Sequence, residues 1–155
     1  MKRVLLATQV LILAIVMTNC SNTSKTTPEP NSQLTSLAQP TPTCTAAEFN
    51  GGSNWIKGQL KAFGEAKPDK AYSYASEEFR KKNSLEAFAL TIISQYRMLL
   101  NLKDYQIVSC DRSQDLYTFK VELTDNDQAH YTMQYLLSFV ANRWGVEGAS
   151  VSFKS

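Results

Sequence analysis

The clearest pattern in the chain is a period-two alternation of apolar and polar residues in its last third. Residues 117–124 alternate in this way and are typical of a half-buried β-strand. The run of short polar residues at 125–128 favours a chain reversal, and a second alternating strand is predicted over residues 130–139. The apolar face of this second strand consists of Tyr131, Met133, Tyr135, Leu137 and Phe139.

Two further strands are predicted beside these, over residues 105–111 and 143–153, the last one after a turn near Ala141 and Asn142. The four strands together predict an antiparallel meander. Gly145 and Gly148 in the last strand predict a bulge or bend, which a curved sheet wrapping a helix requires. Trp144 alternates with Val146 in that strand and is expected to lie in the core.

Helical periodicity precedes the strands. Ser53 is predicted to cap a first helix, Pro68 to open a second short helix, and Ser84 to cap a third. The third helix is expected to lie across the concave face of the meander. Its apolar stripe consists of Leu85, Phe88, Ala89, Ile92, Tyr96 and Leu99. The predicted fold class is therefore α+β, with three N-terminal helices packed on a curved four-stranded antiparallel meander.

The N-terminus reads as an export signal over residues 1–19. Met1-Lys2-Arg3 is followed by an apolar run to Met17 that is too short for a comfortable membrane span. The run ends at Cys20, and this boundary resembles a bacterial lipoprotein signal, in which the cysteine is lipidated and becomes the new N-terminus. Two alternatives remain open, a secreted protein with an ordinary signal peptide and a protein anchored by an uncleaved N-terminal segment.

Residues 20–43 are rich in Ser, Thr, Pro, Asn and Gln, so they are predicted to form a disordered tether before a single domain over residues 44–155. Lys2 and Arg3 are the only charged residues of the signal, which leaves the mature chain with fourteen basic and fourteen acidic residues. A neutral chain of this kind has no electrostatic footprint for nucleic acid. The densest basic run, residues 80–82, is best explained as the solvated end of a helix.

The three cysteines predict one disulfide. If Cys20 carries a lipid, Cys44 and Cys110 remain as a pair in an exported chain, where oxidising conditions let disulfides persist. Such a bond would clip the start of the domain onto its sheet. The alternative is that Cys110 is a small buried apolar residue and Cys44 a free thiol.

The order of helix, short helix, long helix and curved meander resembles the cone-shaped α+β domains of the nuclear transport factor 2-like superfamily. The resemblance covers about residues 53–153 and includes a bacterial family of uncharacterised domains within that superfamily. It implies the fold and says little about activity, because the superfamily contains isomerases, dehydratases, cyclases and binding domains. The segments that carry it are residues 59–63, 71–76, 121–125, 135–137 and 143–148.

The resemblance implies that an enzyme of this type would hold an Asp or His inside the cone beside a Tyr. His130 is the single histidine, and its place after a turn predicts a rim position. Glu122 is expected to pair with a nearby Lys or Arg. Tyr96, Tyr131 and Tyr135 are possible pocket-lining residues, although their spacing also suits a packed core. No catalytic residue, metal site or cofactor is predicted.

The sequence leaves two candidate functions. The first is a non-catalytic envelope lipoprotein domain that binds a small apolar ligand or a protein partner and is attached to the membrane through the lipid on Cys20. The alternative is an isomerase- or dehydratase-type enzyme acting on a hydrophobic carbonyl compound within the cone.

Overall fold

A computed structural model describes residues 43–153. The export signal, Cys20 and most of the tether lie outside these described residues. Within them the α+β class is confirmed, because a set of N-terminal helices precedes an antiparallel sheet with strand order β1-β2-β3-β4. None of the described helices is long and apolar enough to cross a membrane.

The helical part of the described chain consists of four α-helices and one 3-10 turn, where the sequence predicted three helices. The first helix begins earlier than expected, and a short charged helix separates Ser76 from Asn83. The elements are α1 (Ala46–Gly64), α2 (Pro68–Ser73), α3 (Glu77–Lys82), α4 (Leu85–Gln95) and η1 (Arg97–Asn101).

The start of α1 corrects the prediction that Ser53 caps it. Thr45 is the N-cap, and Glu48 completes a reciprocal capping box with it. Ser53 lies within the helix and is buried. The caps predicted at the other two helices are correct, because Pro68 opens α2 and the Ser84 side chain accepts a hydrogen bond from the backbone of Ala87.

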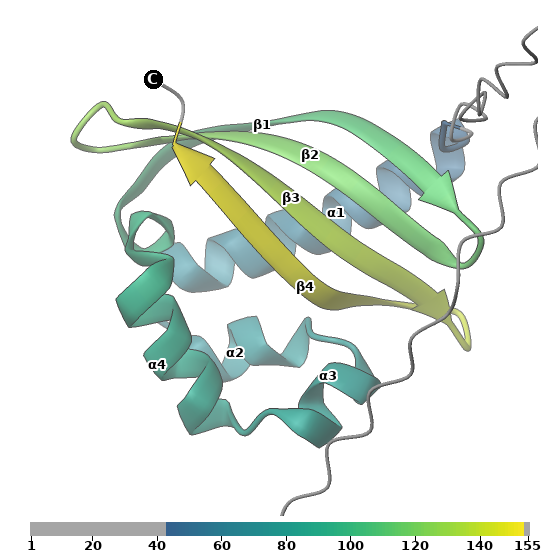
Figure 1. Ribbon diagram of the computed structural model, residues 1–155, viewed down its shortest axis with the longest axis horizontal. Coiled ribbons are helices and arrows are strands. Elements are labelled where there is room, and N and C mark those ends of the chain that lie inside the picture. Colours follow the sequence, from purple (N-terminus) through teal and green to yellow (C-terminus); the bar gives the residue numbers. More distant parts are fainter. Residues whose placement is uncertain (1–42, 154–155) are drawn as a thin grey trace, which may run out of the picture. The chain divides into compact units, whose positions relative to one another are not determined.

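The sheet follows the predicted meander closely. Its strands are β1 (Leu102–Ser113), β2 (Leu116–Asp125), β3 (His130–Val140) and β4 (Arg143–Phe153), each paired with the next in sequence. Ala141 and Asn142 both have positive φ in the β3–β4 turn, as a tight two-residue hairpin requires. Figure 1 shows the strands bending over α1, with α2, α3 and α4 along the side of β4.

The predicted irregularity of β4 is also present. Leu136 pairs with Gly148 and Leu137 with Val146, so Glu147 is the extra residue of a bulge. Gly145 has a different role, because a Cβ there would lie 2.7 Å from the Cα of Ser76. The chain before α3 therefore approaches β4 closely, and it pairs with the strand through a parallel bridge between Ala75 and Val146.

One face of the sheet forms the core with α1. Its fully buried members include Phe119, Val121, Leu123, Met133, Tyr135 and Leu137, and α1 contributes Ile56, Leu60 and Phe63. Trp144, which was predicted to lie in the core, is half-buried and packs against the core. Its ring packs edge-on against Tyr117 with the centroids 4.8 Å apart, and it lies above Gly51 of α1.

Candidate ligand-binding cavity

A cavity of about 230 Å³ remains between the helices and the inner face of the sheet. Its walls come from α1, α3, α4, β3 and β4 and the segments that join them. Ala87 and Thr91 of α4 belong to the lining and are exposed, so the cavity opens to solvent beside this helix. The aromatic residues that line it are Phe63, Phe79, Phe88, Tyr96 and Tyr135.

The polarity of the cavity is low. The described residues that line it include no Asp, Glu, His, Lys or Arg. The polar side chains among them are neutral, and the rest of the surface consists of aromatic and aliphatic groups. Such a surface suits an apolar guest held by a small number of polar contacts.

Tyr135 of β3 supplies the most deeply buried polar group of the cavity. The residue is 1% exposed, and its hydroxyl has no hydrogen-bond partner within the described part of the chain. Burial raises the pKa of this hydroxyl far above its ordinary value, and the nearby Tyr96 raises it further. The Tyr135 hydroxyl therefore stays protonated and keeps a hydrogen to donate.

Tyr96 ends α4 and lines the same cavity. Its hydroxyl donates a hydrogen bond of 2.6 Å to the backbone carbonyl of Ala149 on β4. The hydrogen of this phenol is therefore engaged, whereas that of Tyr135 is not.

Gln59 of α1 is a lining residue that the sequence did not reveal. It is 3% exposed, and its side-chain amide donates a hydrogen bond of 3.0 Å to the carbonyl of Ala71. This bond ties α2 to α1 at the floor of the cavity. The sequence did hold one indication that Gln59 is buried, because it comes one residue before Leu60 on the buried side of α1.

Tyr131 is not part of this cavity. Although it shares the inner face of β3 with Tyr135, four residues of extended strand separate the two by about 13 Å. Its hydroxyl donates to Asp125 at 3.0 Å, and burial followed by this hydrogen bond raises the pKa of Tyr131. The residue lines a separate depression beside Arg97 and Asn101.

His130 and Glu122 also lie outside the cavity. His130 is exposed at the start of β3, and its ring nitrogen is 3.1 Å from the hydroxyl of Thr124. Glu122 forms an ion pair of 3.7 Å with Lys120 on the outer face of β2. Residues 43–153 contain no group of three side chains that could hold a metal ion.

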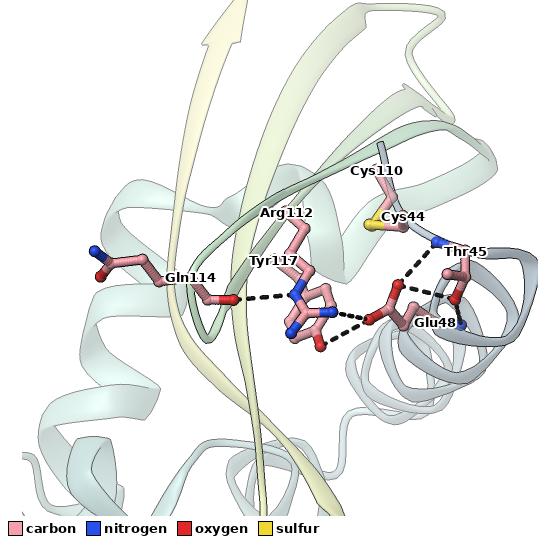
Figure 2. Close-up of a disulfide and its surroundings, with 7 residues drawn as sticks. All are labelled: Cys44, Thr45, Glu48, Cys110, Arg112, Gln114 and Tyr117. Carbon is pink, nitrogen blue, oxygen red and sulfur yellow. Dashed lines mark hydrogen bonds and ion pairs between the residues drawn. A yellow bond between two sulfur atoms is a disulfide. The ribbon is translucent and has the colours of Figure 1, made fainter. Parts of the chain in front are cut away.

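A polar cluster lies beside the disulfide between Cys44 and Cys110. This disulfide confirms the predicted pairing. Figure 2 shows the carboxylate of Glu48 beside it, with Thr45 on one side and Arg112 and Tyr117 on the other. Glu48 accepts hydrogen bonds from the Thr45 backbone at 2.8 Å, from Arg112 at 2.8 Å and from Tyr117 at 3.1 Å. These contacts join the first turn of α1 to β1 and β2.

The fold is like that of solved nuclear transport factor 2-like proteins, as the resemblance implied. A crystal structure of an NTF2-like protein of unknown function from Shewanella baltica OS155 matches with a TM-score of 0.52 at 10% identity, covering 74% of this chain and 99% of that one. A similar protein from Methylobacillus flagellatus KT gives 0.53 at 9% identity, with coverages of 72% and 96%. One from Shewanella oneidensis MR-1 gives 0.51 at 16%, with 68% and 98%.

The sequence shows the family to which the chain belongs. Residues 48–154 match a domain of unknown function, DUF4864, and the chain belongs to this family. No curated protein matches the sequence significantly.

Proposed function

We propose that the domain binds a small apolar ligand in the cavity between α1, α4 and the sheet. The observation that carries the proposal is an apolar pocket of about 230 Å³ that lies between the helices and the sheet and opens to solvent. An apolar cavity of about 150 Å³ is enough to bind benzene. The opening beside Ala87 and Thr91 gives such a ligand a route of entry.

Binding is favoured over catalysis by the chemistry of the lining. A general base must come within hydrogen-bond reach of the proton that it removes. The described lining offers two phenols, one of them engaged, and no carboxylate or imidazole. The isomerase-type alternative therefore has no observation in its favour here.

The export and anchoring of the domain are part of the same proposal. The Cys44–Cys110 disulfide supports a location outside the reducing cytoplasm, and Cys20 is the residue proposed to carry the lipid. Cells fed an alkyne fatty acid should label the wild-type protein and leave Cys20→Ser unlabelled. Equal labelling of both proteins would contradict lipidation at Cys20.

Ligand binding is tested with the bicyclic hydrocarbon tetralin, which is somewhat larger than benzene. Saturation-transfer NMR of the purified full chain should show saturable binding. Ala149 pairs with Tyr135 and so presents its side chain to the cavity, and Ala149→Leu should abolish binding by filling the space. Because cavity filling commonly stabilises a protein, the variant should unfold at an unchanged or higher temperature.

The matched control is Ser150→Leu, at the exposed neighbouring position of β4, where Ser150 pairs with the exposed Gln134. This variant adds the same side chain to the outer face and should bind tetralin as the wild type does. Absence of saturable binding to the wild type, or equal binding by Ala149→Leu, would overturn the proposal.

A further inference from the structure

The β3–β4 turn carries an exposed apolar surface at one end of the sheet. On β3, Val140 is 65% exposed and Phe139 is 41% exposed, and Leu116 of β2 is 40% exposed. Leu116 pairs with Ser138, two residues before Val140 on the same side of β3, so Leu116 and Val140 are diagonal neighbours. We call Leu116, Phe139 and Val140 the apolar tip. Large apolar side chains gathered in this way mark a contact surface for another molecule.

Packing within the sheet holds the apolar tip in place. Phe139 pairs with Trp144 on β4, and the centroids of the two rings are 4.9 Å apart. Trp144 packs in turn on Tyr117, with the ring centroids 4.8 Å apart. The apolar tip therefore belongs to the folded sheet, and no loop has to become ordered before it meets a partner. Little conformational entropy is lost on such a contact.

The apolar tip offers little charge to a partner. Residues 139–144 include one charged side chain, Arg143. Its guanidinium donates a hydrogen bond of 2.7 Å to the backbone carbonyl of Ser73 and lies 5.4 Å from the centre of the Trp55 ring, so it is directed toward the helices. The adjacent β1–β2 turn adds the opposite charge of Asp115. Burial of apolar surface, and not attraction between charges, would therefore drive a contact here.

The chain enters the domain at the same end of the sheet. Thr43 forms a β-bridge with Asp111 near the end of β1, and the disulfide at the next residue holds this junction. Asp111 is in register with Leu136 of β3, two strands away, and Val140 is four residues further along. Two strand spacings and four extended residues place Val140 about 16 Å from the junction. Figure 1 shows the β3–β4 turn and the end of β1 at the same end of the sheet.

We propose that the apolar tip inserts into the lipid bilayer to which the domain is tethered. This inference rests on the lipid anchor proposed at Cys20 and adds a second contact between the same protein and the membrane. A tether of residues 20–43 would hold the domain on the order of 25–30 Å from its anchor, and the apolar tip lies at the end of the domain that the tether enters. The bilayer is then the apolar phase that the tip meets at the highest effective concentration, so a weak contact is enough.

The test uses the tryptophan fluorescence of the mature protein, purified from cell membranes and reconstituted in phosphatidylcholine vesicles with or without brominated acyl chains. Bromine quenches tryptophans that lie close to it, and Trp144 contacts Phe139 of the apolar tip. Brominated lipid should reduce the emission of the wild type. Val140→Asp should suppress this reduction, because a charge is costly to bury in a bilayer. Trp55, on α1, gives the same background in each variant.

Leu90→Asp is the matched control, because Leu90 is 67% exposed, much as Val140 is, but lies on α4. This variant should be quenched as the wild type is. Quenching should also persist in about 1 M salt, where interactions between exposed charges are screened. Equal thermal unfolding midpoints of the three proteins would show that each is folded.

The outcomes separate the apolar tip from the anchor, because flotation of the vesicles in a density gradient reports attachment by itself. A wild type that does not float would overturn the anchor and the insertion with it. A wild type that floats without being quenched, or that is quenched no more than Val140→Asp, would overturn insertion alone and leave a protein as the partner of this surface. Loss of quenching at high salt would show a contact held by charge and would also overturn the proposal.

Discussion

The hydroxyl of Tyr96 donates a hydrogen bond of 2.6 Å to the carbonyl oxygen of Ala149. Because Tyr96 ends α4 and Ala149 lies in β4, this bond joins the helical wall of the cavity to its sheet wall. The two residues are 53 positions apart in the chain, so the contact is part of the tertiary fold and not of local structure.

Removing this bond should weaken the domain modestly. Tyr96→Phe is expected to lower the free energy of unfolding by about 1 kcal/mol, the typical net value of a hydrogen bond. Urea denaturation followed by circular dichroism measures the change. Tyr105→Phe is the matched control, because Tyr105 is also half-buried and its hydroxyl bonds to no described residue. Equal losses in the two variants would contradict a role for the Tyr96 bond.

Two glycines of α1 should respond to alanine with opposite signs. A Cβ at Gly52 would lie 2.2 Å from the ring of Phe119, which is fully buried and cannot move aside, whereas a Cβ at Gly64 would meet nothing within 4 Å. Gly52→Ala should therefore destabilise by about 1 kcal/mol or more, since overpacking exceeds the gain in helix propensity. Gly64→Ala should stabilise by about 0.5 kcal/mol.

Thermal unfolding of both variants under one buffer condition tests this pair. An increase in the unfolding midpoint for Gly52→Ala would show that the contact between α1 and Phe119 is looser than the structure indicates.

The Glu48 carboxylate should make stability depend on acidity. Hydrogen bonds from Thr45, with smaller effects of Tyr117 and Arg112, lower the pKa of Glu48 in the folded state below its ordinary value of 4.5. A lowered folded pKa gives stability that is present above the unfolded pKa and lost as the pH falls through the folded value. In Glu48→Gln this contribution is absent at every pH.

Denaturant titrations between pH 7 and about pH 3 should show the wild type and Glu48→Gln converging as the pH falls. Glu122→Gln, which alters a carboxylate outside this cluster, is the control. A stability difference between wild type and Glu48→Gln that stays constant over this range would contradict the role of the charged carboxylate.

The disulfide should contribute a large part of the domain's stability. The two cysteines are 66 positions apart, and closing a loop of this length is worth about 4 kcal/mol on chain-entropy estimates. The Cys44→Ala/Cys110→Ala double variant should lower the denaturation midpoint by a corresponding amount, and reduction of the wild type should have the same effect. Unchanged midpoints in both would contradict this. Non-reduced peptide mapping should find the two cysteine peptides joined.

The sheet was predictable because its alternation is strict. Phe119 to Leu123 and Met133 to Leu137 place every second residue on the buried face. In the turn after β2, the Asp125 carboxylate accepts a hydrogen bond from the backbone of Ala129, as its residue type predicts. The pattern predicted the meander and the bounds of β2, β3 and β4 to within one residue, whereas β1 is longer at both ends than the predicted residues 105–111.

The start of α1 could not be found in the same way. Gly51 and Gly52 interrupt the helical pattern, and both are there because aromatic rings from the sheet pack against the helix backbone at these positions. That requirement comes from tertiary packing and leaves no local signal. The capping box of Thr45 and Glu48 was the local signal available, and it lay before the two glycines.

The cavity was only partly predictable. Helical and strand periodicity placed Tyr96 and Tyr135 on inward faces, and both line it. Periodicity also predicted that Tyr131 lines the cavity, which is wrong. The alternation shows which face of a strand a residue lies on, but it does not show where along the strand the cavity is. Whether the space between helices and sheet is filled, and whether a buried hydroxyl finds a partner, depends on packing between distant segments.

The Cys44–Cys110 bond also determines how the domain would carry mechanical tension. A pull applied to the chain before Cys44 would pass through the sulfur bridge directly into β1, because that covalent path is shorter than the one through the helices. Residues 45–109, including every helix that borders the cavity, would lie in a closed loop that bears none of this tension. A protein held by its N-terminus to a moving surface could then be stretched at its attachment point while the helical wall of the cavity stays out of the covalent path, which continues from Cys110 into the sheet.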